Sequence, residues 1–322
     1  MSGTAELLFA RARTALKVGL RQFGFKQGDK ILVPDFICEA LVHPLLEFGL
    51  VPTYYSINQD LSPDWQVLES TASNSSHAAI IMVHYFGQPQ DIERFREFSD
   101  QYHLVLIDDN GHGHGGELGG RPLGTFGDIG IGSPRKFVGV PSGGCLYGMT
   151  EESSKFAHSM LRYPAYGLKS VARTFVYSFQ PLWRLVKSWA YRNKEWGNPY
   201  CFRDSVELDY RIDLLSRWCI EKVDWKIIAR QRRDRWHAWE RFLEGKGLSL
   251  VFTDVHPESC PLALPAYASE LSERNRWLIW GVEKKIPLYP WPSLPESVIA
   301  EKASALRRWG KLICFPLDVS PP

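Results

Sequence analysis

Apolar and polar residues follow two different rhythms over the first half of the chain. From residue 5 to 23 the apolar positions recur at helical spacing, which predicts one helix that ends in the polar sequence GFKQGDK. Short apolar runs predict buried strands at 30–34, 51–58, 77–87 and 104–109. Helical spacing returns in the segments 38–50 and 91–103. Strands that alternate with helices in this way predict a mostly parallel sheet covered by helices on both faces.

The second half of the chain is less regular. A long charged amphipathic helix is expected from about 213 to 245, and apolar runs predict strands at 248–252 and 312–317. This change of character divides the chain in two. Residues 1–205 are expected to form a large α/β domain, and residues 206–322 a smaller C-terminal α+β domain.

Residues 155–196 are unusually rich in arginine, lysine and aromatic residues. Two arrangements fit this composition. The first is a pair of helices that pack on the core while their basic side chains extend to solvent. The second is an interfacial helix within 162–196 that rests on anionic lipids, as a peripheral contact at the inner face of the membrane.

The composition argues against several classes of protein. At 322 residues the chain can bury a sizeable core, and its 38 Lys and Arg residues nearly balance its 36 Asp and Glu residues. We therefore expect no nucleic-acid partner, because such partners select strongly basic surfaces. The six cysteines are scattered without a CxxC pair, which is typical of a reducing cytoplasm. A charged N-terminus and the lack of a run of about 18 apolar residues predict neither a signal peptide nor a membrane-spanning helix.

Residues 107–116, IDDNGHGHGG, place acids and histidines directly after a predicted strand. Ligands of parallel sheets bind at the carboxyl ends of the strands, where Asp109 is expected. One interpretation is a metal site in which Asp109, His112 and His114 bind zinc or iron, with His84 as a further ligand. Another is a glycine-rich turn whose histidines bond only the backbone. We favour a third, a carbonyl cofactor, and predict no metal.

Pyridoxal 5'-phosphate (PLP) needs groups that this region supplies. A lysine must hold the cofactor as a Schiff base, a carboxylate must face the pyridine nitrogen, and backbone amides at a helix N-terminus should bind the phosphate. Asp109 ends a predicted strand, and His112 follows on the turn, within reach of the ring oxygen. Lys136 follows the next apolar strand, DIGIGS, so it is expected one strand across from Asp109.

Four ordered motifs lie between residues 9 and 148. They are FARARTALKVGLRQFGFKQGDKILVPDFIC, the HYFGQPQD loop, LIDDNGHGHG and GDIGIGSPRKFVGVPSGGCLYG. Together they resemble the DegT/StrS-type sugar aminotransferases of the fold-type-I PLP superfamily. In that family the corresponding stretches read about GRAAL before GDEVIVPAYTC, H-x-Y/F-G-Q-P-x-D, VIEDAAQAHG and GDIG…S…K…GGAL.

The resemblance implies a fold and a set of site residues. The fold is a fold-type-I PLP transferase, with a mostly parallel central sheet, helices on both faces and a smaller C-terminal α+β domain. Lys136 matches the Schiff-base lysine, Asp109 the pyridine-binding acid and His112 the residue that orients the ring. The other implied cofactor contacts are the phosphate turn Ala12, Arg13 and Thr14 and a ring-stacking position at Phe36 or Cys38. Ser133, three residues before the lysine, either donates to the phosphate or simply ends the strand.

A second stretch of the sequence could form the phosphate-binding turn. One continuous helix over 5–23 would engage the amides of residues 12–14 in helical hydrogen bonds. Only Gly19 interrupts the helix-forming residues of that stretch. The sequence SGTA at 2–5 is therefore an alternative phosphate turn.

The resemblance also implies a function. It is a PLP-dependent aminotransferase that moves an amino group from an amino acid such as glutamate to a nucleotide-linked keto sugar, in surface-glycan or amino-sugar biosynthesis. A cytoplasmic homodimer is expected, because sites of this family lie at a subunit interface. Two other classes stay open: a non-catalytic scaffold or binding protein with the PLP fold, and a metal-dependent hydrolase.

Overall fold

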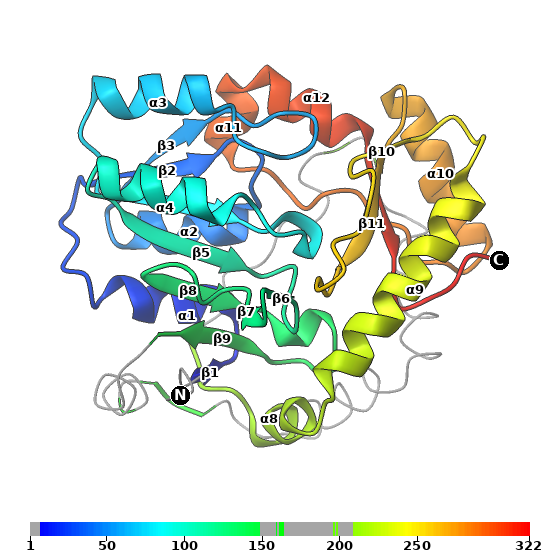
Figure 1. The fold of residues 1–322 in the computed structure, drawn as a ribbon, viewed down its shortest axis with the longest axis horizontal. Helices are drawn as coiled ribbons and strands as arrows, with labels where there is room; N and C mark the ends of the chain where they lie inside the picture. Colours follow the sequence, from blue (N-terminus) through cyan, green and yellow to red (C-terminus); the bar gives the residue numbers. More distant parts are fainter. Residues whose placement is uncertain (1–6, 149–158, 160, 164–195, 197, 199–208) are drawn as a thin grey trace.

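The computed structural model describes residues 7–148, 159, 161–163, 196, 198 and 209–322 (Figure 1). Its larger sheet has seven strands in the order β1-β9-β8-β5-β4-β2-β3. These strands are β1 (Leu7–Phe9), β2 (Lys30–Pro34), β3 (Val51–Tyr55), β4 (Ala79–Val83), β5 (Val105–Asn110), β8 (Ile129–Gly132) and β9 (Gly144–Tyr147). Neighbours from β3 to β8 pair in parallel, whereas β9 runs opposite to both β8 and β1. The predicted mostly parallel sheet is confirmed.

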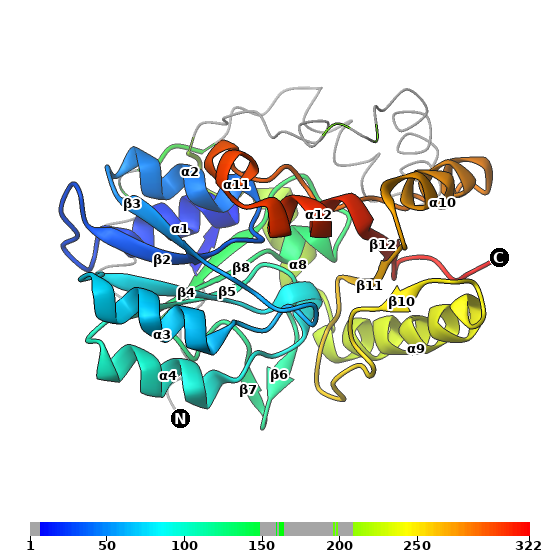
Figure 2. The ribbon, with the colours of Figure 1, turned by 90° about the horizontal axis from the view of Figure 1, so that it is seen from above.

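Helices cover both faces of this sheet, as predicted (Figure 2). On one face lie α1 (Ala12–Leu20) and α2 (Glu39–Glu47), and on the other lie α3 (Trp65–Asn74) and α4 (Ile92–Gln101). Every residue of the central strand β4 is buried, as expected for a strand covered on both sides. Asp64 and Asp91 cap the N-termini of α3 and α4, and their carboxylates accept hydrogen bonds from the amides of Val67 and Arg94.

A smaller antiparallel sheet follows in the C-terminal part. Its strands are β10 (Ser249–Leu250), β11 (Ala263–Tyr267) and β12 (Leu312–Pro316). Helices α9 (Trp225–Leu243) and α10 (Leu271–Glu283) pack against it. The remaining elements are β6 (Glu117–Leu118), β7 (Arg121–Pro122), the 3₁₀ turns η1 (Tyr85–Gly87) and η2 (Pro134–Lys136), α8 (Leu214–Glu221), α11 (Glu296–Glu301) and α12 (Ala303–Lys311). Trp291, Trp309 and Cys314 belong to the same hydrophobic cluster as the strands of the larger sheet, so the two sheets share a core.

The prediction of a single helix over 5–23 is wrong. Residues 7–9 form β1, which pairs with β9 and buries Phe9 completely. The helix α1 starts only at Ala12, after Arg11 adopts an extended backbone conformation. The apolar residues of this short edge strand happen to continue the helical spacing of α1, so the sequence pattern alone extended the predicted helix over them.

The long helix expected over 213–245 is two helices. α8 ends at Glu221, and α9 starts after Asp224. The Asp224 carboxylate accepts hydrogen bonds from the amides of Lys226 and Ile227. An aspartate that caps a new helix separates the two, because its side chain competes for the amides that a continuous helix would use.

The predicted domain division at residue 205 falls outside the described residues. All strands of the larger sheet precede it and all strands of the smaller sheet follow it. The basic aromatic segment 155–196, with its suggested membrane contact over 162–196, also lies almost entirely outside the described residues. Within the described ranges, no helix combines the length and the hydropathy that crossing a bilayer requires.

Candidate functional site

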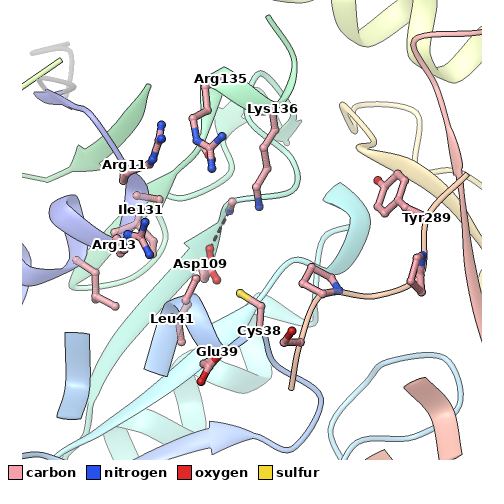
Figure 3. Close-up of a pocket in the computed structure, with 18 residues that line it drawn as sticks. Arg11, Arg13, Cys38, Glu39, Leu41, Asp109, Ile131, Arg135, Lys136 and Tyr289 are labelled. Atoms are coloured by element: carbon pink, nitrogen blue, oxygen red, sulfur yellow. Dashed lines mark hydrogen bonds between the residues drawn. The ribbon is translucent and has the colours of Figure 1, made fainter. Parts of the chain in front are cut away.

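Two ionisable side chains meet beyond the carboxyl ends of β5 and β8. Asp109 lies near the end of β5, which is paired in parallel with β8, so the predicted one-strand separation is present. The chain leaves β8 at Ser133 and turns through η2, which ends at Lys136. A Cβ atom built on Gly111 would lie 2.9 Å from Asp109 Oδ1 and 3.7 Å from Lys136 Nζ, so both groups lie close to this glycine. Figure 3 shows the amine and the carboxylate directed toward the same cavity.

The surroundings set the charge of these groups. Burial raises the pKa of Asp109, while the Lys136 ammonium and the Gly111 amide oppose that rise. The Gly111 amide donates to Asp109 Oδ1 at 2.8 Å, drawn as a dashed line in Figure 3. Burial and the Lys136 charge hold the pKa of His112 well below its ordinary value, so its imidazole is neutral at pH 7. An acid that a nearby cation favours as carboxylate is suited to face a protonated ring nitrogen.

The N-terminus of α1 supplies the positive end of a helix dipole. Its first intrahelical hydrogen bond runs from Ala15 N to Arg11 O at 3.2 Å. The amides of Ala12, Arg13 and Thr14 therefore precede the helical ladder, and the Arg11 side chain does not cap them. The expectation that one continuous helix engages these amides is wrong. A helix start of this kind favours a phosphate.

Gly144 of β9 allows α1 to begin where it does. A Cβ atom on Gly144 would lie 2.1 Å from the carbonyl carbon of Arg11 and 2.2 Å from the Ala12 nitrogen. Real Cβ atoms do not approach backbone so closely, so a larger residue would displace the helix start. The second glycine of SGGCLY thus has a packing reason in addition to its match to a motif.

These groups line one cavity of about 310 Å³. The basic wall is formed by Arg11 and Arg13 at the start of α1, with Arg135 and Lys136 on η2 (Figure 3). Other parts of the lining are contributed by Ala12, Leu16, Cys38, Glu39, Ala40, Leu41, Asp109, Gly111, Ile131 and Ser133. A further side comes from the distant C-terminal segment, through Tyr289, Pro290, Pro292 and Ser293. The cavity therefore combines an anion-binding wall, an acid, an amine and an uncharged wall.

Six of the predicted site residues line this cavity together. They are Lys136, Asp109, Ser133, Ala12, Arg13 and Cys38. Thr14 is not among the lining residues, since its Oγ1 donates to Asp209 Oδ1 at 2.8 Å. The Thr14 backbone still belongs to the first turn of α1.

Phe36 and His112 lie in an aromatic layer beside the cavity, not in its lining. Phe36 is fully buried and stacks on Trp291, with ring centroids 4.6 Å apart. The structure therefore leaves Cys38, of the two residues suggested to cover a ring, in the lining. His112 Nδ1 accepts a hydrogen bond from Phe86 N at 3.4 Å, and its ring meets the edge of Trp291 at 5.3 Å.

The histidines suggested as metal ligands point to separate partners. His84 Nε2 lies 3.0 Å from Asp108 Oδ1, in a fully buried contact. His114 Nδ1 lies 2.9 Å from the Tyr147 hydroxyl, and burial lowers the pKa of His114 to about 3. In the described part of the chain, no group of three or more His, Cys, Asp or Glu side chains is placed to hold a metal ion.

Sequence reasoning missed several lining residues. Two of them are arginines, Arg11 before α1 and Arg135 beside Lys136. The C-terminal wall, defined here as Tyr289, Pro290, Pro292 and Ser293, comes from the sequence YPWPS. That proline-rich run was a signal of a rigid extended segment, but nothing in the sequence pairs it with the lining residues between Arg11 and Lys136.

The residues present fit PLP. Lys136 offers a primary amine for the aldehyde carbon, and Asp109 offers a carboxylate for the pyridine nitrogen. The start of α1, flanked by Arg11 and Arg13, offers backbone amides and positive charge for the phosphate. These three groups face one space of suitable size for a small cofactor and a substrate.

Comparison of the sequence with protein families gives one match. The model of the DegT/DnrJ/EryC1/StrS aminotransferase family matches residues 7–178, more than half of the chain. GDP-perosamine synthase of Vibrio cholerae is 31% identical over 116 residues, which are 36% of this chain and 31% of that protein. UDP-N-acetyl-3-dehydro-alpha-D-glucosamine 3-aminotransferase of Acidithiobacillus ferrooxidans is 29% identical over 147 residues, 45% of this chain and 40% of the relative. The matched segments thus span about a third of these relatives.

Solved structures resemble the whole fold at low sequence identity. PseC of Helicobacter pylori, an aminotransferase involved in the biosynthesis of pseudoaminic acid, superposes with a TM-score of 0.69 at 16% identity, covering 97% of this chain and 81% of PseC. The putative sugar aminotransferase Spr1654 of Streptococcus pneumoniae, in its PLP form, gives a TM-score of 0.72 at 14% identity and covers 98% and 83%. At these identities the likeness establishes the fold, and the predicted fold class is confirmed.

Proposed function

This chain belongs to the DegT/DnrJ/EryC1/StrS aminotransferase family, and from that premise we propose that it is a PLP-dependent aminotransferase with a nucleotide-linked keto sugar as acceptor. An amino acid such as glutamate is the proposed donor. The names of the relatives, a GDP-perosamine synthase and a UDP-linked 3-aminotransferase among them, support this acceptor class.

The observation that carries the proposal is the convergence of Lys136, Asp109 and the start of α1 on one cavity. Each group alone is common in proteins. Here the three groups match three parts of one molecule, PLP. The amine and the acid, on neighbouring strand ends, match its aldehyde and its ring nitrogen, and the helix N-terminus with its arginines matches its phosphate.

Each residue has a distinct task in this proposal. When bound, PLP withdraws electrons from the substrate carbon that carries the amino group. Asp109 holds the proton of the ring nitrogen, because its carboxylate is buried and has a nearby cation to balance it. The Ala12–Thr14 amides and Arg13 hold the phosphate and so fix the depth of the cofactor. His112 supports the ring from the aromatic layer, through its contact with Trp291.

Lys136 both binds and catalyses. Its Nζ would hold the cofactor in the resting enzyme and would become a free amine once a donor amine replaces it. That amine would be the base that takes the proton from the donor Cα and the acid that returns it. The acceptor ketone receives the amino group by the reverse steps, with Lys136 again moving the proton.

The assembly and location of the enzyme are part of the proposal. We place it in the cytoplasm as a homodimer with domains 1–205 and 206–322, and allow a peripheral membrane contact through 162–196. Exposed apolar side chains on α8, Leu214 at 58% and Trp218 at 59%, support an association surface. Light scattering of the purified protein measures the oligomeric state, and sedimentation with anionic liposomes at low salt tests the membrane contact.

The test of the function starts with cofactor binding. Purified protein is incubated with PLP and its visible absorbance is recorded, then borohydride is added and the modified peptide is mapped by mass spectrometry. We expect a PLP absorption band and a reduced adduct on Lys136, both lost in Lys136→Ala. In a separate sample that has not been reduced, glutamate should abolish the band, and GDP-, UDP- and dTDP-linked keto hexoses should restore it.

Each stage has its own contrary result. If no adduct forms in the wild-type protein, the chain is a PLP-fold scaffold and not an aminotransferase. If the adduct forms but no keto sugar restores the band after glutamate, the acceptor class is wrong while the cofactor assignment stands.

A further inference from the structure

The C-terminal wall of the cavity is tied down at three places. Tyr289 exchanges two backbone hydrogen bonds with Cys314 of β12, at 2.8 and 3.3 Å. The Trp309 indole donates to Trp291 O at 3.0 Å. The backbone oxygen of Ser293 accepts from Glu39 N, at the start of α2, also at 3.0 Å. This segment therefore bridges the smaller sheet and the larger sheet as a fixed surface.

Side-chain packing makes the same segment rigid. Trp291 is 2% exposed and stacks on Phe36, with Phe86 and His112 in edge contact. The prolines on either side, Pro290 and Pro292, fix the backbone φ angle where the chain passes the cavity. Positions on this wall are thus set before any ligand arrives.

Ser293 places a buried hydroxyl on this rigid wall. The residue is 3% exposed and lines the cavity. Its Oγ has no hydrogen-bond partner within the described part of the chain. A buried hydroxyl without a partner costs free energy, and native proteins rarely keep one unless a ligand or water completes it. The hydroxyl is therefore a candidate contact for a bound molecule.

The two walls of the cavity suit different chemical groups. The α1 and η2 side of the cavity carries Arg11, Arg13 and Arg135, which suit phosphate and carboxylate groups. The C-terminal wall offers only tyrosine, proline and serine side chains, which carry no charge at pH 7. An uncharged surface with a hydroxyl suits a sugar ring, whose faces are apolar and whose edge carries hydroxyls.

We infer that Ser293 is a substrate-binding residue that hydrogen-bonds a hydroxyl of the sugar ring of the acceptor. This inference rests on the proposed function and adds a site for the acceptor that the donor does not use. The amino-acid donor brings carboxylates, which the arginine wall accommodates, so loss of the Ser293 hydroxyl affects one half-reaction and spares the other.

The experiment measures the two half-reactions separately in the PLP-loaded enzyme. Glutamate is mixed with wild type, Ser293→Ala and Ser293→Thr, and loss of the PLP band is followed. The aminated enzyme is then mixed with a panel of GDP-, UDP- and dTDP-linked keto hexoses, and return of the band is followed. Ser259→Ala is the matched control, because Ser259 is fully buried, bonds His256 O at 2.8 Å and does not line the cavity.

We expect Ser293→Ala to raise KM for the accepted sugar about tenfold, the effect of one lost hydrogen bond of about 1.4 kcal/mol. The glutamate half-reaction should match wild type, and Ser293→Thr should restore most of the acceptor affinity. Calorimetry with GDP-mannose, UDP-glucose and dTDP-glucose, which hold a hexose but no ketone, should show the same loss of affinity without turnover.

Three results overturn the inference. Equal acceptor KM in wild type and Ser293→Ala shows that the hydroxyl does not contact the sugar. An equal fall in both half-reactions shows that Ser293 places the cofactor instead. A wild-type enzyme that reacts with glutamate but with no panel sugar contradicts the proposed acceptor, and the inference fails with it. Unchanged melting temperatures of the variants exclude unfolding as the cause of any of these results.

Discussion

His84 Nε2 lies 3.0 Å from Asp108 Oδ1, directly behind the strand end that presents Asp109 to the cavity. The Gln90 amide donates to His84 Nδ1 at 3.0 Å, so Nε2 is the ring nitrogen that faces Asp108. Asp108 Oδ2 accepts from Phe126 N at 3.0 Å. The two consecutive acids therefore have different surroundings: Asp108 holds the end of the strand, and Asp109 faces the cavity.

Breaking the His84–Asp108 contact should destabilise the protein. Both side chains are fully buried, and removal of the imidazole leaves a cavity beside a buried carboxylate oxygen. We expect His84→Ala to lower the free energy of unfolding by about 3 kcal/mol, as measured by urea denaturation. The substitution His43→Ala, on the partly exposed face of α2, serves as a control with a small effect. A His84→Ala protein as stable as this control contradicts the structural role of the pair.

Asp109→Asn should separate binding from catalysis. The amide has the shape of the carboxylate but cannot hold a proton on the ring nitrogen. We expect the borohydride adduct on Lys136 to persist while turnover falls about 100-fold, the size typical of losing one group that stabilises developing charge. The readouts are adduct mass and the rate of the glutamate half-reaction. Turnover within about threefold of wild type would contradict the role assigned to Asp109.

Gly144→Ala should disturb the start of α1. The added methyl would lie 2.2 Å from the Ala12 nitrogen, so the helix start or β9 must move. We expect unfolding free energy to fall by about 3 kcal/mol and PLP affinity to fall with it. Gly310→Ala in α12 is the matched control, since nothing lies within 4 Å of its Cβ position. The control should gain about 0.5–1 kcal/mol, because alanine favours a helix more than glycine does. Equal behaviour of the two variants would show that Gly144 has no packing role.

The sequence predicted the central part of the fold and its two main reactive groups. Buried parallel strands appear as continuous apolar runs, and β2, β4 and β5 were found in that way. Lys136 and Asp109 were paired because one strand separates them in sequence order, and parallel strands of this kind end at the same edge. Local signals were sufficient wherever adjacent elements in the sequence are also neighbours in the sheet.

The features that the sequence did not predict depend on contacts between distant segments. Residues 7–9 form a strand because β9, more than 130 positions later, lies beside them. Phe36 leaves the cavity lining because Trp291 stacks on it. The C-terminal wall faces Lys136 only through the packing of β12 and α12 against the larger sheet. No periodicity within a short window carries this information.

Acidification should weaken the fold through His114. Burial lowers its pKa from 6.5 to about 3 in the folded chain. An unfolded chain therefore binds a proton between pH 6.5 and 3 that the folded chain does not, so stability falls as pH falls through this window. Between pH 7.5 and 5.5 this one residue should remove about 1.3 kcal/mol. His112, whose pKa is lowered by burial and by Lys136, acts in the same direction.

The variant His114→Gln isolates this contribution. Glutamine does not titrate, so its unfolding free energy should fall less between pH 7.5 and 5.5 than that of wild type, by about 1.3 kcal/mol. Its stability at pH 7.5 should be lower than wild type, because the contacts with Tyr147 and Trp225 are altered. The comparison therefore uses the pH dependence and not the absolute stability. If urea titrations show that both proteins lose the same unfolding free energy on acidification, His114 is protonated in the folded chain. The assignment of His114 as a buried, neutral side chain is then wrong.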